Sequence, residues 1–191
     1  MRHPSLATLT KPERMRMRKI IKNKAIVDDQ WNVFKCSEGE SPETATVPAG
    51  FQIVPLQVWL AQKTTLAARK DIAVWLASDE RAEQLKEDIA TLPLIAVDFP
   101  AFSDGRGYSI AFNLRTRLGY DGEIRAIGDV LRDQLFYMQR VGFDAFATRE
   151  DRSIDDALKG LTDFSDVYQT SWDQKTPLFR RANRPAAQDL P

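Results

Sequence analysis

The segment from Leu92 to Thr148, LPLIAVDFPAFSDGRGYSIAFNLRTRLGYDGEIRAIGDVLRDQLFYMQRVGFDAFAT, decides the fold. Three short apolar runs in it, LPLIAVDF, GEIRAIGD and DAFAT, are typical of buried strands. The two stretches between them have apolar residues at helical spacing, as at Ile110, Leu114 and Leu118. The order strand, helix, strand, helix, strand predicts parallel strands joined by right-handed crossover helices.

The sequence before this segment extends the same pattern. FQIVPLQVWLAQ predicts a strand followed by a helix around Leu56 to Gln62, and DIAVWLA, residues 71–77, predicts another buried strand. ERAEQLKEDIA predicts an amphipathic helix, because Ala82, Leu85 and Ile89 share one face. We therefore expect one α/β domain over residues 17–180, with about four parallel strands arranged as an open sheet or a partial barrel.

The residues that precede this domain core predict an N-terminal β-hairpin. IIKNKAIVDDQWNVF, from Ile20 to Phe34, contains two β-prone runs around Asp28 and Asp29, where we place the turn. The next stretch, residues 36–50, is rich in Ser, Thr, Glu, Pro and Gly and predicts a surface loop.

Composition limits the classes of protein to consider. The 191 residues are 43% hydrophobic and 28% charged, and no apolar run approaches the ~18 residues that cross a membrane. These values predict a soluble, cytoplasmic protein of one domain. The single cysteine, Cys36, and the single histidine, His3, argue against a protein-ligated metal, an iron-sulfur cluster or Cys-His catalysis. The identity of any other cofactor is open.

Charge is unevenly distributed along the chain. The net charge is zero, but residues 1–24 hold eight Lys or Arg side chains and one Glu. We interpret residues 1–16 as a basic flexible leader and residues 181–191 as a flexible tail. The basic segment has no interleaved aromatic residues, so a nucleic-acid partner is not expected.

Two glycine-containing turns follow neighbouring predicted strands, where ligands of α/β sheets bind. Gly105 and Gly107 would let the backbone around Arg106 adopt positive φ, and helix amides near Ser109 could hold an anion. Asp98 and Asp129, at the ends of the two strands, are candidates for a general base. The complete set of candidate anion-binding or partner-binding residues is Asp104, Gly105, Arg106, Gly107, Tyr108, Ser109, Arg125, Gly128, Asp129 and Arg132.

Three interpretations of these residues are open. The aspartates and arginines could form an ion-pair network that only fixes the two loops. They could instead bind a small anion, or they could form a surface on which a partner docks. The Gly-Arg-Gly sequence matches neither a Walker loop nor the dinucleotide-binding fingerprint, so no nucleotide motif decides between them.

The segment IAVDFPAFSDGRGYSIAFNLRTRLGYDGEIRAIGDVLRDQLFYMQRVGFDAF, residues 95–146, together with KAIVDDQW nearer the N-terminus, resembles the bacterial family called domain of unknown function 934. The resemblance covers residues 17–180 and implies that relatives begin near Met17. Members of that family are typically encoded beside assimilatory sulfite reductase and phosphoadenylylsulfate reductase, and some are labelled probable oxidoreductases.

The resemblance implies an accessory protein of assimilatory sulfate or sulfite reduction. Such a protein would dock on the reductase machinery or assist electron delivery to it, with sulfite reductase or phosphoadenylylsulfate reductase as the partner. Two alternatives stay open: an enzyme or sensor that binds a small anion such as a sulfonucleotide, and a structural homodimer subunit.

Overall fold

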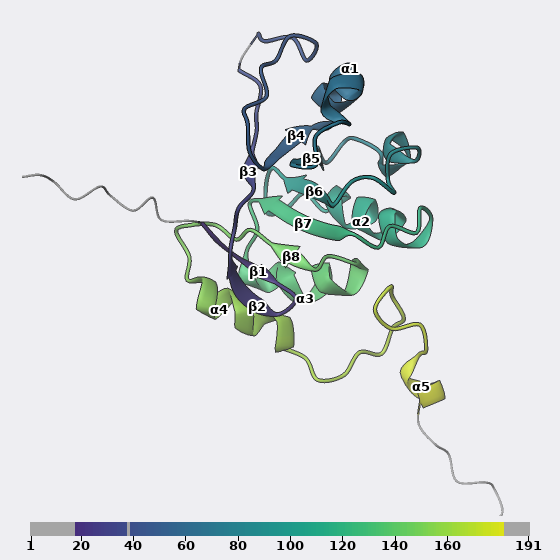
Figure 1. Ribbon diagram of the computed structural model, residues 1–191. Helices are drawn as coiled ribbons and strands as arrows, with labels where there is room; N and C mark the ends of the chain where they lie inside the picture. The colour runs from purple at the N-terminus through teal and green to yellow at the C-terminus, as the bar shows by residue number, and fades with distance from the viewer. Residues whose placement is uncertain (1–17, 38, 182–191) are drawn as a thin grey trace, which may run out of the picture.

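The computed structural model describes residues 18–37 and 39–181 (Figure 1). The predicted leader, residues 1–16, its boundary at Met17 and the tail after Arg181 lie outside these residues. The strands are β1 (Lys19–Lys22), β2 (Ala25–Asp28), β3 (Asn32–Val33), β4 (Gln52–Pro55), β5 (Ile72–Leu76), β6 (Leu94–Phe99), β7 (Glu123–Gly128) and β8 (Ala145–Phe146). The helices are α1 (Leu56–Leu66), α2 (Arg106–Thr116), α3 (Arg132–Val141), α4 (Ile154–Lys159) and α5 (Leu178–Arg181), with 3₁₀ turns η1 (Ala82–Leu85) and η2 (Gly160–Thr162).

All eight strands form one sheet in the order β2-β1-β8-β7-β6-β5-β4-β3. Strands β3 to β8 are parallel and lie side by side in chain order, and the β1–β2 hairpin adds antiparallel to β8. The prediction of an α/β fold with parallel strands and an N-terminal hairpin is confirmed. The two-residue strands β3 and β8 extend the four longer parallel strands at both sides.

The sheet is curled into a half-barrel, and a short connection shows why. Strands β2 and β3 occupy opposite edges of the sheet, seven interstrand spacings apart, which is about 34 Å in a flat sheet. The chain from Asp28 to Asn32 extends at most about 14 Å. Residues Asp29–Trp31, which we call the strap, therefore hold the two edges close together; Figure 1 shows the chain running from β2 past the intervening strands up to β3.

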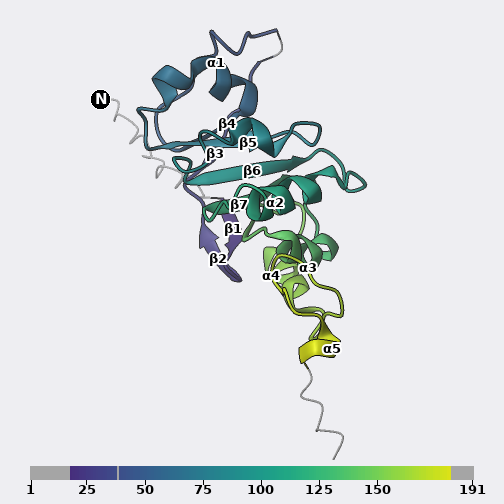
Figure 2. The ribbon, with the colours of Figure 1, turned by 90° about the vertical axis from the view of Figure 1, so that its right-hand side faces the viewer.

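Each face of the sheet has its own apolar cluster, because strand side chains alternate between the faces. On β6, Ile95 and Val97 point to the helices, and Figure 2 shows α2 and α3 in front of the sheet. Leu94 and Ala96 point to the concave face, where Trp31 of the strap packs against them. The strap thus covers a face of the sheet on which none of the described helices packs.

The predicted position of the hairpin turn is wrong. The turn lies at Asn23 and Lys24, which both have positive φ, 49° and 63°. Asp28 ends β2, and Asp29 begins the strap instead of a turn. Asn tolerates positive φ, but the single Asn23 gave a weaker turn signal than the pair Asp28 and Asp29 at the other end of β2.

The predicted amphipathic helix after β5 is a 3₁₀ turn, η1, of four residues. Its apolar residues Ala82 and Leu85 are buried as predicted. The chain continues in tight turns, with Asp88 N donating to the Leu85 carbonyl, and the buried Asp88 accepts a hydrogen bond from Trp59 Nε1 at 2.9 Å and pairs with Lys63. These contacts fix the segment after η1 against α1.

Candidate functional site

The carboxyl ends of β5, β6 and β7 form one edge of the half-barrel, which we call the carboxyl mouth. Four residues define it: Ser78 after β5, Asp98 on β6, Asp104 in the β6–α2 loop and Gly128 at the end of β7. Asp98 follows Leu94 and Ala96 at intervals of two, so its side chain points to the concave face. It is paired in register with Ile127 of β7 and is half-buried.

Gly128 makes room for the Asp98 carboxylate. Its φ is +90°, and a Cβ atom at this position would lie 2.7 Å from Asp98 Oδ1 and 2.4 Å from the Phe99 carbonyl oxygen. Glycine is therefore required both for its backbone conformation and for the close approach of β6. The sequence predicted that Gly128 belongs to the site, and the structure places it in contact with Asp98.

Asp104 is already engaged by its neighbours. Its carboxylate accepts hydrogen bonds from the backbone N of Arg106 at 3.1 Å, from Arg106 Nε at 3.0 Å and from Arg106 Nη2 at 2.7 Å. Arg106, and next the hydroxyl of Ser78, hold the pKa of Asp104 well below its usual range. Asp104 therefore stays ionised and links the loops that follow β5 and β6.

Asp129 organises the loops instead of facing the concave side. Its Oδ2 accepts a hydrogen bond from the backbone N of Phe102 at 2.9 Å, and its Oδ1 accepts one from Arg149 Nη1 at 3.0 Å. Both oxygens hold neighbouring segments in place. This geometry gives Asp129 the role of a loop anchor.

The expectation that Gly105 and Gly107 adopt positive φ is wrong. Gly105 precedes α2 with a φ of −86°, and Gly107 lies within the helix. A Cβ on Gly107 would approach Phe99 Cζ to 2.6 Å, so this glycine allows α2 to pack closely on β6. Arg106 and Ser109 are exposed on α2, and Arg106 is occupied by Asp104.

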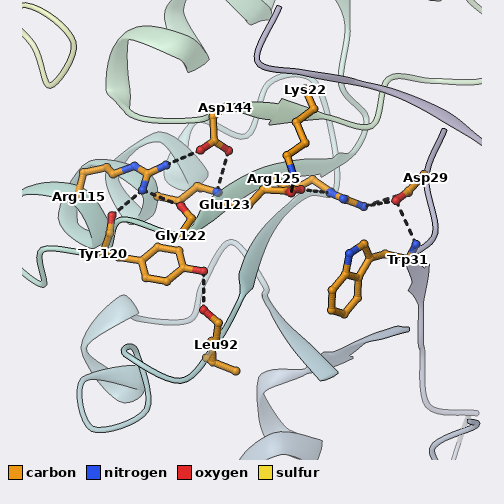
Figure 3. A network of polar contacts seen from close by, with 11 residues as sticks. Lys22, Asp29, Trp31, Leu92, Arg115, Tyr120, Gly122, Glu123, Arg125 and Asp144 are labelled. Carbon is orange, nitrogen blue, oxygen red and sulfur yellow. Dashed lines mark hydrogen bonds and ion pairs between the residues drawn. The ribbon is translucent and has the colours of Figure 1, made fainter. Parts of the chain in front are cut away.

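Two predicted members of the site lie elsewhere. Arg125 is only 2% exposed and points to the concave face, where Figure 3 shows it between Glu123 and Asp29. Its Nε donates to Glu123 at 2.7 Å and its Nη1 donates to both Asp29 oxygens at 2.9 Å. Arg132 begins α3 and pairs with Asp163 at 2.8 Å. The structure thus does not bring Arg125 and Arg132 together with Arg106.

The pKa of Asp98 is raised above its ordinary value. Burial is the main cause, the nearby Asp104 carboxylate adds to it, and Lys35 acts in the opposite direction. Asp104, a few residues away, has its pKa lowered. Two neighbouring carboxyl groups whose pKa values are pushed apart are typical of sites that handle protons or bind polar ligands. Sequence reasoning missed both Lys35 and Ser78, since no motif connects their distant loops to Asp98.

A second feature of the same region is a surface rich in aromatic side chains, the aromatic face, which consists of Phe102, Tyr108, Phe112 and Tyr137. Tyr108 stacks edge-on with Phe99 at 5.4 Å between ring centroids and with Tyr137 at 5.2 Å. Phe102, Phe112 and Tyr137 are 51%, 39% and 54% exposed. Tyr108, Phe112 and Tyr137 line a groove of about 440 Å³ beside Thr170 and Ser171.

Residues 73–179 match the family model described as "Bacterial protein of unknown function (DUF934)". The match covers more than half of the sequence and runs from the second residue of β5 through β8, and it includes the aromatic face. The chain belongs to this family. No curated protein matches the DUF934 chain. Its described part contains no helix long and apolar enough to span a membrane.

Proposed function

We propose that this DUF934 protein is a cytoplasmic accessory protein of assimilatory sulfate or sulfite reduction that docks on the reductase machinery through the aromatic face. The observation that supports docking is the exposure of Phe102, Phe112 and Tyr137. These three side chains come from the β6–α2 loop, α2 and α3. Aromatic residues that expose a third or more of their surface in adjoining elements are typical of protein interfaces.

The surroundings of the aromatic face fit an interface. Arg117 lines the same groove and its side chain is 70% exposed, and Arg is enriched with Tyr among residues that dominate binding energies. The polar groups of Ser109, Thr170 and Ser171 surround the rings. The side chain of Gln134 donates to the Phe102 carbonyl at 3.2 Å and fixes the loop that presents Phe102.

The anion-binding alternative has less support from the geometry. Arg106 is taken by Asp104, Arg125 is buried against Asp29 and Glu123, and the three guanidinium groups do not converge. The proposed partner is therefore a protein, and we favour assimilatory sulfite reductase, with phosphoadenylylsulfate reductase as the second protein to test.

Native mass spectrometry with each purified reductase tests the proposal. We expect a heterocomplex with the full-length chain, and at least a tenfold higher Kd for the double variant Phe112→Ala/Tyr137→Ala. Leu60→Ala on α1 is the matched control, because Leu60 is also 41% exposed and lies outside the groove. A homodimer that binds neither reductase would contradict docking and favour the structural-subunit alternative.

A further inference from the structure

The strands β1 and β8, which join the N-terminal hairpin to the rest of the sheet, separate at one end. They pair antiparallel up to Ile21 and Phe146. Continued in the same register, this ladder would place Lys19 opposite Thr148. No backbone hydrogen bond joins these two residues. The strands therefore leave an opening at the carboxyl end of β8, and ligands of α/β sheets bind outside the carboxyl ends of parallel strands.

A cavity of about 550 Å³, which we call the β8 cavity, is lined by residues from both sides of this opening. Its volume lies within the range of about 300 to 1,000 Å³ that is usual for small-molecule sites. Four of its lining residues are basic and one is acidic: Arg18, Lys19, Arg149 and Arg152, against Glu150. The lining thus has an excess of three positive charges, which favours an anion.

Two of these cations are available to a ligand. Lys19 is exposed and forms no ion pair with any carboxylate of residues 18–37 and 39–181. The side chain of Arg152 is 68% exposed and only comes within 3.8 Å of Asp151. That carboxylate already accepts from Arg149 at 2.8 Å. Lys19 and Arg152 therefore have unused capacity to pair with a negative group.

Thr148 adds a neutral donor to the cavity. The residue is only 7% exposed, and its hydroxyl has no hydrogen-bond partner among the described residues. The oxygen is not one of the side-chain atoms that are sealed from solvent, so the little surface that Thr148 exposes includes it. Phe146, two residues earlier, packs on the helix side of the sheet, which directs Thr148 to that side as well. There α4 packs against β1 and β2 (Figure 1), and Ile154 of α4 also lines the cavity.

We propose that the β8 cavity binds the phosphate group of a small anion, which accepts a hydrogen bond from the Thr148 hydroxyl and pairs with Lys19 and Arg152. A phosphate group suits these partners because it carries up to two negative charges and several strong acceptor oxygens on one phosphorus atom. A hydroxyl held by buried surroundings fixes the orientation of such a ligand. The site contains no residue of the aromatic face and none of the arginines first considered for anion binding, so it does not depend on docking.

Titration of the ¹⁵N-labelled full-length chain tests the proposal at constant pH and ionic strength. The probes are glycerol 3-phosphate, inorganic phosphate and glycerol, which has no phosphate group. We expect saturable amide shifts at Lys19, Thr148 and Arg152 with both phosphates and no saturable shifts with glycerol. The tighter of the two phosphates shows whether the cavity prefers an ester or the free ion.

Variants assign the shifts to the side chains. Thr148→Val, which loses only the hydroxyl, and Lys19→Gln should each weaken glycerol 3-phosphate binding at least tenfold. Thr148→Ser keeps the hydroxyl, and Lys86→Gln changes an exposed lysine outside the cavity, so both should bind nearly as the wild type does. Circular dichroism checks that the variants are folded. Absence of saturable shifts at these amides with either phosphate, or unchanged binding by folded Lys19→Gln, would overturn the proposal.

Discussion

Asp29 and Arg125 lie 96 positions apart in the sequence, and yet the guanidinium of Arg125 donates from one nitrogen to both carboxylate oxygens of Asp29 at 2.9 Å. Both side chains are 3% exposed. The contact joins the strap to β7, in the middle of the sheet, across the concave face. Glu123 and Lys22 complete a group of four charges that sum to zero.

Loss of Asp29 should therefore destabilise the protein strongly. Among the described residues, Asp29→Ala leaves the buried Arg125 with Glu123 as its only carboxylate, and breaking a buried pair from one side costs about 3 to 5 kcal/mol. Urea denaturation measures the change. Glu150→Ala is the control. It removes a solvent-exposed ion pair with Arg18 and should leave the urea midpoint unchanged. A midpoint for Asp29→Ala equal to that of Glu150→Ala would contradict the structural role of the pair.

Gly128→Ala should be much more harmful than Gly50→Ala. The two glycines have nearly the same φ, +90° and +87°, so both substitutions carry the conformational cost of positive φ. Only at Gly128 would the new Cβ meet the Phe99 carbonyl and Asp98, since nothing lies within 4 Å of a Cβ at Gly50. Thermal melts of the two variants measure the difference. Equal melting temperatures would show that β6 and β7 separate readily at the carboxyl mouth.

Leu114→Ala and Arg106→Ala, both on α2, should have different effects. The first should lower stability, and the second should affect function more than stability. Leu114 is fully buried, and truncation leaves a cavity that costs about 2 to 5 kcal/mol. Arg106 is exposed and, within residues 18–37 and 39–181, pairs only with Asp104, so its variant should unfold at nearly the wild-type temperature. Calorimetry compares the two, and growth on sulfate of a deletion strain carrying Arg106→Ala reports any separate loss of function. An Arg106→Ala variant as unstable as Leu114→Ala would make this arginine a structural strut.

Asp98→Asn should stabilise the protein at neutral pH. The folded-state pKa of Asp98 lies above its ordinary value of 3.8, so between the two values the folded state binds more protons than the unfolded chain. The free energy of unfolding therefore falls as pH rises through this window, and the loss persists at pH 7. The asparagine variant should melt higher than the wild type at pH 7, and the difference should close as pH falls below about 4.

The exposed Asp121→Asn serves as the control for this experiment and should not change the melting temperature at either pH. If Asp98→Asn lowers the melting temperature at pH 7, the carboxylate stabilises the fold.

The strands β5 to β8 could be predicted because each one is a short apolar run between polar turns. The helix-like segments between them then favour parallel neighbours. The strap could not be predicted. Its anchor, Asp29, resembles a turn residue in the sequence, and its partner is a distant arginine. A local pattern carries no information about a contact of this separation.

The positions of the candidate residues were predicted in part. Asp98, Asp104 and Gly128 meet where neighbouring parallel strands end, as strand order implies. Arg125 was misplaced, because it lies three residues before the end of β7 and its side chain turns to the concave face with that of Glu123. Lys35 could not be found, since it lies beyond the short strand β3 and no local pattern connects it to Asp98.

The position of the first hairpin sets a condition on how the chain can fold during synthesis. Ile21 of β1 pairs with Phe146 of β8, so the hairpin emerges from the ribosome 125 residues before its neighbour exists. At translation rates of about 5 to 20 residues per second, this interval is on the order of 6 to 25 s. Throughout it, Ile20 and Ile21 have no sheet to pack against, and a nascent-chain chaperone would meet an unpaired strand edge.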